Sequence, residues 1–125
     1  MTRSRTITIN VSRKTGDVFD AILDLPPKMT ENAKKNADGS WSFTTPRGPA
    51  YLKFNENKSF GILDHVFKDN EAKWDVPMRV VSSGDESEIM ITLVKPDEIT
   101  DEQFNERMKE MEELVSTMKK IIEQN

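Results

Sequence analysis

The sequence contains no cysteine and only one histidine among its 125 residues, and these two shortages exclude several kinds of site. Without cysteine there can be no disulfide framework, thiolate nucleophile or zinc–thiolate centre. A lone histidine, with no HExxH or calcium-loop spacing, gives no basis for a metal site. There is also no glycine-rich phosphate loop, G-x-S-x-G elbow or Ser/His/Asp set, so we predict no cofactor and assign no catalytic residue.

Long apolar runs are missing as well. No run approaches the roughly 18 residues that a membrane-spanning helix needs. The opening Met-Thr-Arg-Ser-Arg leads into a strand-like alternation and not into the apolar segment of a signal peptide. We therefore expect a cytoplasmic protein without membrane insertion. A chain of this length forms a core of its own, so residues 1–125 are expected to be a single domain.

The sequence has no clustered positive charge. Its net charge is −4; residues 1–58 carry ten Lys/Arg against six Asp/Glu, and residues 59–125 carry eight against sixteen. Phosphate backbones are bound by clustered cations, and the basic first half has no interleaved aromatic residues. We expect no nucleic-acid partner, and a monomer or a weak dimer.

Alternating apolar segments followed by one long amphipathic segment are the main features that the sequence does have. Alternation predicts strands at residues 6–11, 41–45, 50–54, 60–67, 74–80 and 89–93. An apolar face at 17–24 predicts a short helix that Pro26 and Pro27 end, and a second short helix is expected at 28–35. Residues 100–125 are predicted to form one helix, which begins at a capping box of Thr100 and Gln103. Its apolar stripe consists of Phe104, Met108, Met111, Val115, Met118 and Ile122, widened by Leu114 and Ile121.

This order of elements predicts an α+β protein rather than a parallel α/β one. The expected architecture is a curved, six-stranded antiparallel sheet wrapped around the long C-terminal helix. The two short helices after the first strand would close one end of the sheet. A curved sheet that grips one helix can leave a cavity between them.

Several segments resemble the START-like superfamily, also called the SRPBCC or Bet v 1-like group, which has the helix-grip fold. Residues 15–22 (TGDVFDAI) are similar to that group's first helix, and residues 60–65 (FGILDH) to its central strand. Residues 77–81 (PMRVV) and 100–104 (TDEQF) resemble small prokaryotic members described as polyketide cyclase-like. The resemblance implies a hydrophobic pocket between the sheet and the C-terminal helix that takes lipids, polyketides or other apolar molecules.

Large apolar side chains on the helix stripe and in the strands are the candidates for lining that pocket. Methionine is flexible and polarisable, so it suits a surface that adapts to apolar partners, but it also fills gaps in a dry core. The volume that decides between these two interpretations cannot be obtained from the sequence. The candidates are Trp41, Phe43, Phe54, Trp74, Met78, Met90, Phe104, Met108 and Met111.

Asp64 and His65 are the candidates for a polar contact inside the pocket. Neighbouring residues of a strand point to opposite faces, so only one of the two can face the pocket. Both faces of residues 60–67 are apolar, which leaves open which one it is. His65 has an unperturbed pKa near neutrality and could act as an acid or base if it faces inward. Arg79 is expected to face outward in a cross-strand ion pair.

The leading functional prediction is the binding of a small apolar molecule, lipid-like or polyketide-like, in a cavity between the sheet and the C-terminal helix. The ligand is expected to enter near Pro26, Pro27 and the turns at 47–49 and 69–70. Two alternatives stay open from the resemblance: a cyclase or dehydratase-type enzyme, and a protein-interaction module like the Hsp90-ATPase activators.

Overall fold

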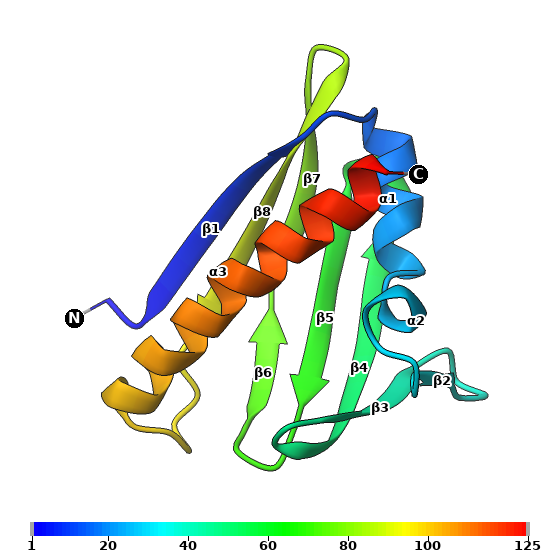
Figure 1. Cartoon of the computed structure of the whole chain (residues 1–125). Coiled ribbons are helices and arrows are strands. Elements are labelled where there is room, and N and C mark those ends of the chain that lie inside the picture. Colours follow the sequence, from blue (N-terminus) through cyan, green and yellow to red (C-terminus); the bar gives the residue numbers. More distant parts are fainter. Residues whose placement is uncertain (1, 125) are drawn as a thin grey trace.

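The computed structural model describes residues 2–124; Met1 and Asn125, the last residue of the predicted C-terminal helix, lie outside that range. It confirms an α+β protein in which a long helix crosses one face of an antiparallel sheet (Figure 1). The strand order is β1-β8-β7-β5-β4-β3-β2, and β6 pairs with β5 beside this path. The strands are β1 (Ser4–Val11), β2 (Lys34–Lys35), β3 (Trp41–Thr45), β4 (Gly48–Asn57), β5 (Ile62–Lys68), β6 (Lys73–Val76), β7 (Met78–Ser83) and β8 (Glu86–Val94). The helices are α1 (Thr15–Leu23), α2 (Pro26–Met29), the 3-10 turn η1 (Lys58–Phe60) and α3 (Asp101–Glu123).

The sheet has eight strands where six were expected, and both extra strands have a local cause. The predicted strand at 74–80 is divided at Pro77, which has no N–H to give to a ladder. The chain changes partner there, because β6 pairs with β5 whereas β7 pairs mainly with β8. The second extra strand is the two-residue β2, which pairs with β3 at the edge. The predicted helix at 28–35 is wrong, since the second helix is instead the single turn Pro26–Met29.

The predicted capping box starts α3. The Thr100 hydroxyl accepts a hydrogen bond from the Gln103 backbone N–H at 3.1 Å, and the Gln103 side chain accepts one from the Thr100 N–H at 2.8 Å. From there the helix runs diagonally across the sheet and ends beside α1 (Figure 1). Most of the predicted apolar stripe is buried, but Leu114 stays 42% exposed.

Strand register defines the two faces of the sheet. Residues that pair in register lie on the same face, and alternate residues of each strand lie on the other face. The inner face, toward α3, includes the buried residues Leu63, Trp74, Val76, Met78, Val80, Ile89, Ile91 and Leu93. The opposite face is called the outer face below.

Candidate ligand-binding site

The inner face is closed along one half and partly open along the other. The inward-facing apolar residues of β6, β7 and β8 are almost fully buried in the core. In β3, β4 and β5 several large inward-facing side chains are only half-buried, and they continue the core toward the edge strand β2. We call this set the inner apolar surface: Phe43, Leu52, Phe54 and Phe67, together with Met111 of α3.

The residues of the inner apolar surface are brought together by pairing across three strands. Leu52 lies in register with Phe67, and Phe54 with His65. The Phe43 and Phe67 rings lie 6.2 Å apart between centroids, and the Phe54 and His65 rings 5.3 Å apart. Phe43 and Phe54 were among the residues predicted from the sequence to line the pocket. Leu52 and Phe67 were not, although their alternation with neighbouring residues indicates the same face.

A cleft next to this surface lies between α1 and strands β3 and β4. Its volume is about 450 Å³, and Trp41 and Phe54 reach it from the inner face. The remaining walls are mostly polar and include Asp20 and Asp24 of α1 and Lys53 of β4. This volume is within the range of small-molecule sites, roughly 300–1,000 Å³. The cleft therefore gives the half-buried aromatic residues a route to solvent.

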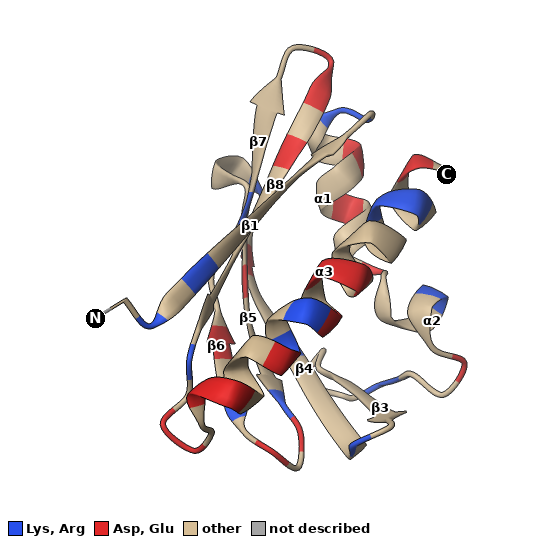
Figure 2. Cartoon of the chain, turned by 60° about the vertical axis from the view of Figure 1, so that its left-hand side comes forward, with Lys and Arg blue, Asp and Glu red and all other residues tan. Residues whose placement is uncertain are grey.

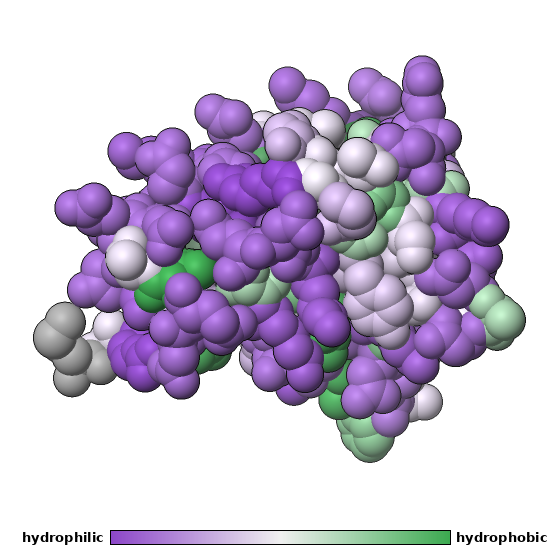
Figure 3. Space-filling model, turned by 90° about the horizontal axis from the view of Figure 1, so that it is seen from below, coloured by the Kyte–Doolittle hydropathy of each residue, from purple (hydrophilic) through white to green (hydrophobic). Residues whose placement is uncertain are grey.

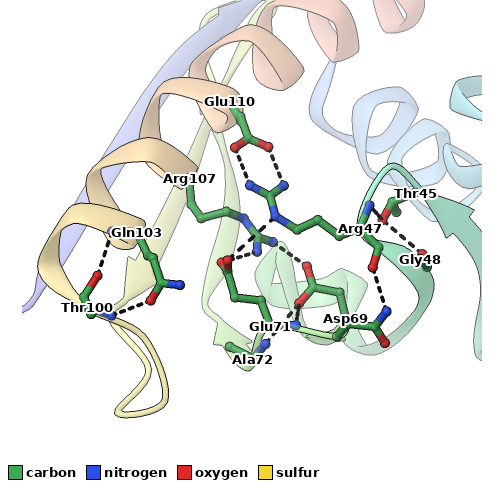
Figure 4. Close-up of polar contacts among 11 residues, drawn as sticks. Thr45, Arg47, Gly48, Asp69, Glu71, Ala72, Thr100, Gln103, Arg107 and Glu110 are labelled. Atoms are coloured by element: carbon green, nitrogen blue, oxygen red, sulfur yellow. Dashed lines mark hydrogen bonds and ion pairs between the residues drawn. The ribbon is translucent and has the colours of Figure 1, made fainter.

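An ionic cluster joins α3 to two turns of the sheet at the opposite end of the inner apolar surface (Figure 4). Arg47, in the β3–β4 turn, donates two hydrogen bonds to the Glu110 carboxylate at 2.6 and 2.7 Å. Arg107 of α3 lies 2.8 Å from the Asp69 carboxylate and 2.9 Å from that of Glu71, both in the β5–β6 turn. The turns at 47–49 and 69–70, where ligand entry was expected, are thus tied to the helix.

Two pairs of this cluster differ sharply in burial. The Arg107 and Asp69 side chains are 13% and 2% exposed, against 32% and 46% for Arg47 and Glu110. Burial alone would raise the pKa of Asp69, but the N–H groups of Ala72 and Glu71 and the charge of Arg107 lower it overall. The hydrogen bonds from Arg47 lower the pKa of Glu110 in the same way.

Trp74 sits on the inner face beneath this cluster, as expected. Its ring stacks on that of Phe104 with centroids 6.0 Å apart, and the Arg107 guanidinium lies 5.1 Å from the Trp74 ring centroid. Trp74 is 2% exposed, and its indole N–H has no hydrogen-bond partner among the residues that the structure describes. Trp74, Phe104, Met78 and Met108 are therefore packed core residues in this structure and not parts of an open wall.

His65 faces inward, which answers the question that the sequence left open. It is in register with Phe54 and Val76 of the inner face. Its Nδ1 lies 3.0 Å from the Leu63 carbonyl oxygen, so in the neutral ring Nδ1–H donates and Nε2 keeps its lone pair. Burial lowers the pKa of His65, and this outweighs the hydrogen bond to Leu63 and the charge of Asp64, which act in the opposite direction.

Asp64 and Met90 lie on the outer face, so they do not meet the other expected pocket residues. Asp64 accepts a hydrogen bond from the Met78 N–H at 3.0 Å and forms an ion pair with Arg79, which confirms the predicted outward position of Arg79. Met90 is in register with Arg79, whereas the next residue, Ile91, is in register with Met78. The alternation of β8 therefore turns Met90 away from α3.

Charged side chains cover much of the rest of the molecule. Acidic and basic segments follow one another along α3, with acidic residues in its first turn (Figure 2). Seen from the end at which α3 begins, the surface is mostly hydrophilic, with smaller apolar areas between the polar side chains (Figure 3). No helix within residues 2–124 has the length and apolar character to cross a membrane.

No family model matches the sequence, and no curated protein matches it either. Solved structures, in contrast, match it over nearly the whole chain. A START superfamily protein from Mycobacterium smegmatis is 12% identical, covers 97% of each chain and gives a TM-score of 0.70. Truncated norcoclaurine synthase from Thalictrum flavum is 14% identical over 99% of this chain and 92% of its own, with a TM-score of 0.69.

A protein from Arthrobacter aurescens is 13% identical over 99% of this chain and 88% of its own, with a TM-score of 0.73. These identities are too low to transfer an activity, but the coverage and scores define the architecture. The chain has the helix-grip fold of START-like and Bet v 1-like proteins.

Proposed function

We propose that the protein binds a small apolar molecule, lipid-like or polyketide-like, between α3 and the inner faces of β3, β4 and β5. The inner apolar surface carries this proposal, because its aromatic side chains are half-buried beside an otherwise closed core. Covering exposed apolar area contributes about 25 cal/mol per Å² before the entropic costs of binding. A cytoplasmic location and a monomeric or weakly dimeric state are part of the same proposal.

The cleft beside α1 is the proposed entrance. It reaches Trp41 and Phe54, whereas the other end of the inner apolar surface is tied by the Arg47 and Arg107 ion pairs. His65 would supply the polar contact that orients the ligand, through the free lone pair on Nε2. Similar proteins support this assignment by their fold alone.

A neutral apolar fluorophore such as 1-aminoanthracene tests the proposal directly. In Met111→Trp, a larger side chain fills the space beside the half-buried aromatics, and we expect the affinity for the fluorophore to fall about tenfold or more. Val81→Trp is the matched control, because Val81 is 39% exposed on the outer face. Equal affinity in the wild type and Met111→Trp would contradict the proposal. If the affinity falls as expected, native mass spectrometry of gently purified protein, and of its organic extract, would identify the natural ligand.

The environment of His65 favours a second candidate function, a cyclase or dehydratase-type enzyme with His65 as general base. Its lowered pKa keeps the ring neutral near pH 7, and the hydrogen bond at Nδ1 leaves Nε2 to accept a proton. With the extracted compound as substrate, His65→Gln should abolish turnover and leave affinity nearly unchanged. Asp64→Asn changes the neighbouring residue on the other face and should preserve turnover. If His65→Gln lost both turnover and affinity, His65 would be a ligand contact, and its role as general base would be contradicted.

A further inference from the structure

A row of polar side chains crosses the outer face, on the strand segments of β2 to β6 that lie near the lower end of the sheet in Figure 1. Lys34 of β2 is in register with Ser42, Ser42 with Tyr51, Tyr51 with Lys68, and Lys68 with Lys73. The row therefore spans five adjacent strands. It lies opposite the inner apolar surface, because it alternates with Trp41, Leu52 and Phe67 along the strands.

Among residues 2–124, no carboxylate oxygen lies within 4.0 Å of the ammonium groups of the three lysines in this row, Lys34, Lys68 and Lys73, whereas the nearby Arg47, Lys53 and Arg107 each have a carboxylate partner. The Glu98 carboxylate accepts a hydrogen bond from the Lys73 backbone N–H at 3.1 Å. Asp69 lies nearby, but its carboxylate is buried and bound by Arg107. Lys68 and Lys73 also stand directly opposite each other across two strands, an arrangement of like charges that destabilises a sheet.

A depression of about 570 Å³ lies over this row. Lys34, Ser42, Tyr51 and Lys68 line it, together with Asn32 and Asn70. The two asparagines are fixed by hydrogen bonds: Asn32 accepts from the Thr44 N–H at 2.7 Å, and Asn70 donates to the Arg47 carbonyl at 2.7 Å. The space is open and large enough for a small organic molecule, and apolar surface, to which Phe43, Pro49 and Ala50 contribute, lies beside these polar groups.

We propose that this outer depression binds a small phosphate-bearing molecule, with its phosphates on Lys34 and Lys68, which line the depression, and its body over Tyr51. Lys73, which pairs with Lys68 on the neighbouring strand, would add positive charge at the edge of the site. Neighbouring strands lie about 4.8 Å apart, so the Lys34 and Lys68 backbones stand about 14 Å apart, and their long side chains can converge over the ring between them. Lysine acts as a point charge toward phosphate and does not need the planar geometry that arginine requires. A bound anion would also relieve the repulsion between Lys68 and Lys73. The lysines of this site lie on the face opposite the inner apolar surface, although Phe43 lines both sites.

Titration with inorganic pyrophosphate at constant ionic strength, followed by ¹H–¹⁵N NMR, tests the site. We expect saturable shifts in the millimolar range or below, centred on the backbone amides of the row. The triple variant Lys34→Gln/Lys68→Gln/Lys73→Gln should lose about tenfold or more in affinity. The control Lys14→Gln/Lys109→Gln/Lys120→Gln removes the same charge from three exposed lysines that lie outside the depression.

The proposal is supported if only the first triple variant loses affinity, and it is overturned if both variants lose it equally. Shifts spread over lysines elsewhere, or shifts that never saturate, would also overturn it. Thermal unfolding excludes a folding artefact: without anion, Lys68→Gln should be at least as stable as the wild type, because the opposed charge is gone. Pyrophosphate should raise the Tm of the wild type but not that of the first triple variant. Unchanged 1-aminoanthracene binding in that variant would show that the two sites are separate.

Discussion

At the scale of single residues, His65 and Gly61 depend most on their surroundings. His65 is an ordinary imidazole in the sequence, and only the inward direction of its side chain and the Leu63 carbonyl give it a defined tautomer. Gly61 has a φ of 66°, and a Cβ there would lie 2.3 Å from the Val80 carbonyl oxygen. The inward direction of His65 and the contact of Gly61 with Val80 both depend on strand pairing, so neither can be read from the local sequence.

Stability should depend on pH through His65. Burial lowers its folded-state pKa below the ordinary value of 6.5, so between these two values the unfolded chain binds more protons. The stabilising contribution is therefore fully present above pH 6.5 and is lost as the pH falls from 6.5 through the folded-state pKa. Urea denaturation at a series of pH values should show this loss in the wild type and not in His65→Gln. An identical pH profile for the two proteins would contradict the burial of a neutral ring. Asp69 and Glu110, whose pKa values are lowered, titrate at lower pH and do not interfere.

Replacement of Gly61 should be costly, whereas replacement of Gly16 should not. Gly61→Ala forces a side chain into the left-handed region and against Val80, so we expect the free energy of unfolding to fall by about 2 kcal/mol or more. In α1, a Cβ at Gly16 meets nothing within 4 Å, and Gly16→Ala should stabilise the protein by about 0.5 kcal/mol. Chemical denaturation of the two variants and the wild type would measure both changes in the free energy of unfolding. A Gly61→Ala protein as stable as the wild type would show that the turn before β5 can shift.

At the scale of elements, α3 was predicted almost completely, but the ion pairs that join it to the turns of the sheet were not. The stripe and the capping box specify a helix from about residue 100 because they repeat at short, fixed spacings. Glu110 lies outside the apolar stripe of that helix, and its partner Arg47 is 63 residues away in the chain. Long-range ion pairs leave no periodic pattern, and this is why the cluster was missed. The strand break at Pro77, in contrast, had a signal in the sequence, because a proline inside an alternating segment argues against a continuous ladder.

The two arginines of the ionic cluster should differ in their contribution to stability. Arg107→Met leaves the buried Asp69 carboxylate without its cation, so we expect a loss of about 3 kcal/mol in the free energy of unfolding. Arg47→Met removes a pair that is largely in contact with water, and the expected loss is about 1 kcal/mol or less. Urea denaturation of both variants checks the difference. Equal losses would mean that the hydrogen bonds from Ala72 and Glu71 are enough to hold the Asp69 carboxylate.

At the scale of the whole molecule, the sheet presents two unlike surfaces. The inner face changes from a closed core under α3 to half-buried aromatics near β3, and the outer face carries the row of unpaired lysines. The overall architecture could be predicted because the alternating strands give the sheet an apolar face, and the apolar stripe of the long helix can be buried against that face. The inner positions of Trp41, Phe43 and Phe54 followed from the same alternation. The directions of His65 and Asp64 could not be decided, because β5 is apolar on both sides and its pattern does not show which side faces the core. The outward direction of Met90, in contrast, follows from the alternation of β8, where Ile89 and Ile91 share the other face.

The corner where β1 meets α1 has a consequence for how this chain is made. There the Ser12 N–H donates to the Glu123 carboxylate at 2.8 Å, a contact between groups 111 residues apart, and the Arg13 side chain binds the Glu123 carbonyl. Within residues 2–124, β8 is the one strand with which β1 pairs. On a ribosome, β1 therefore emerges before the other strands of this sheet and must wait for β8, and its apolar face stays uncovered while most of the sheet is synthesised. Nascent chains stalled before residue 86 would lack the whole of β8, and β1 would have no strand to pair with.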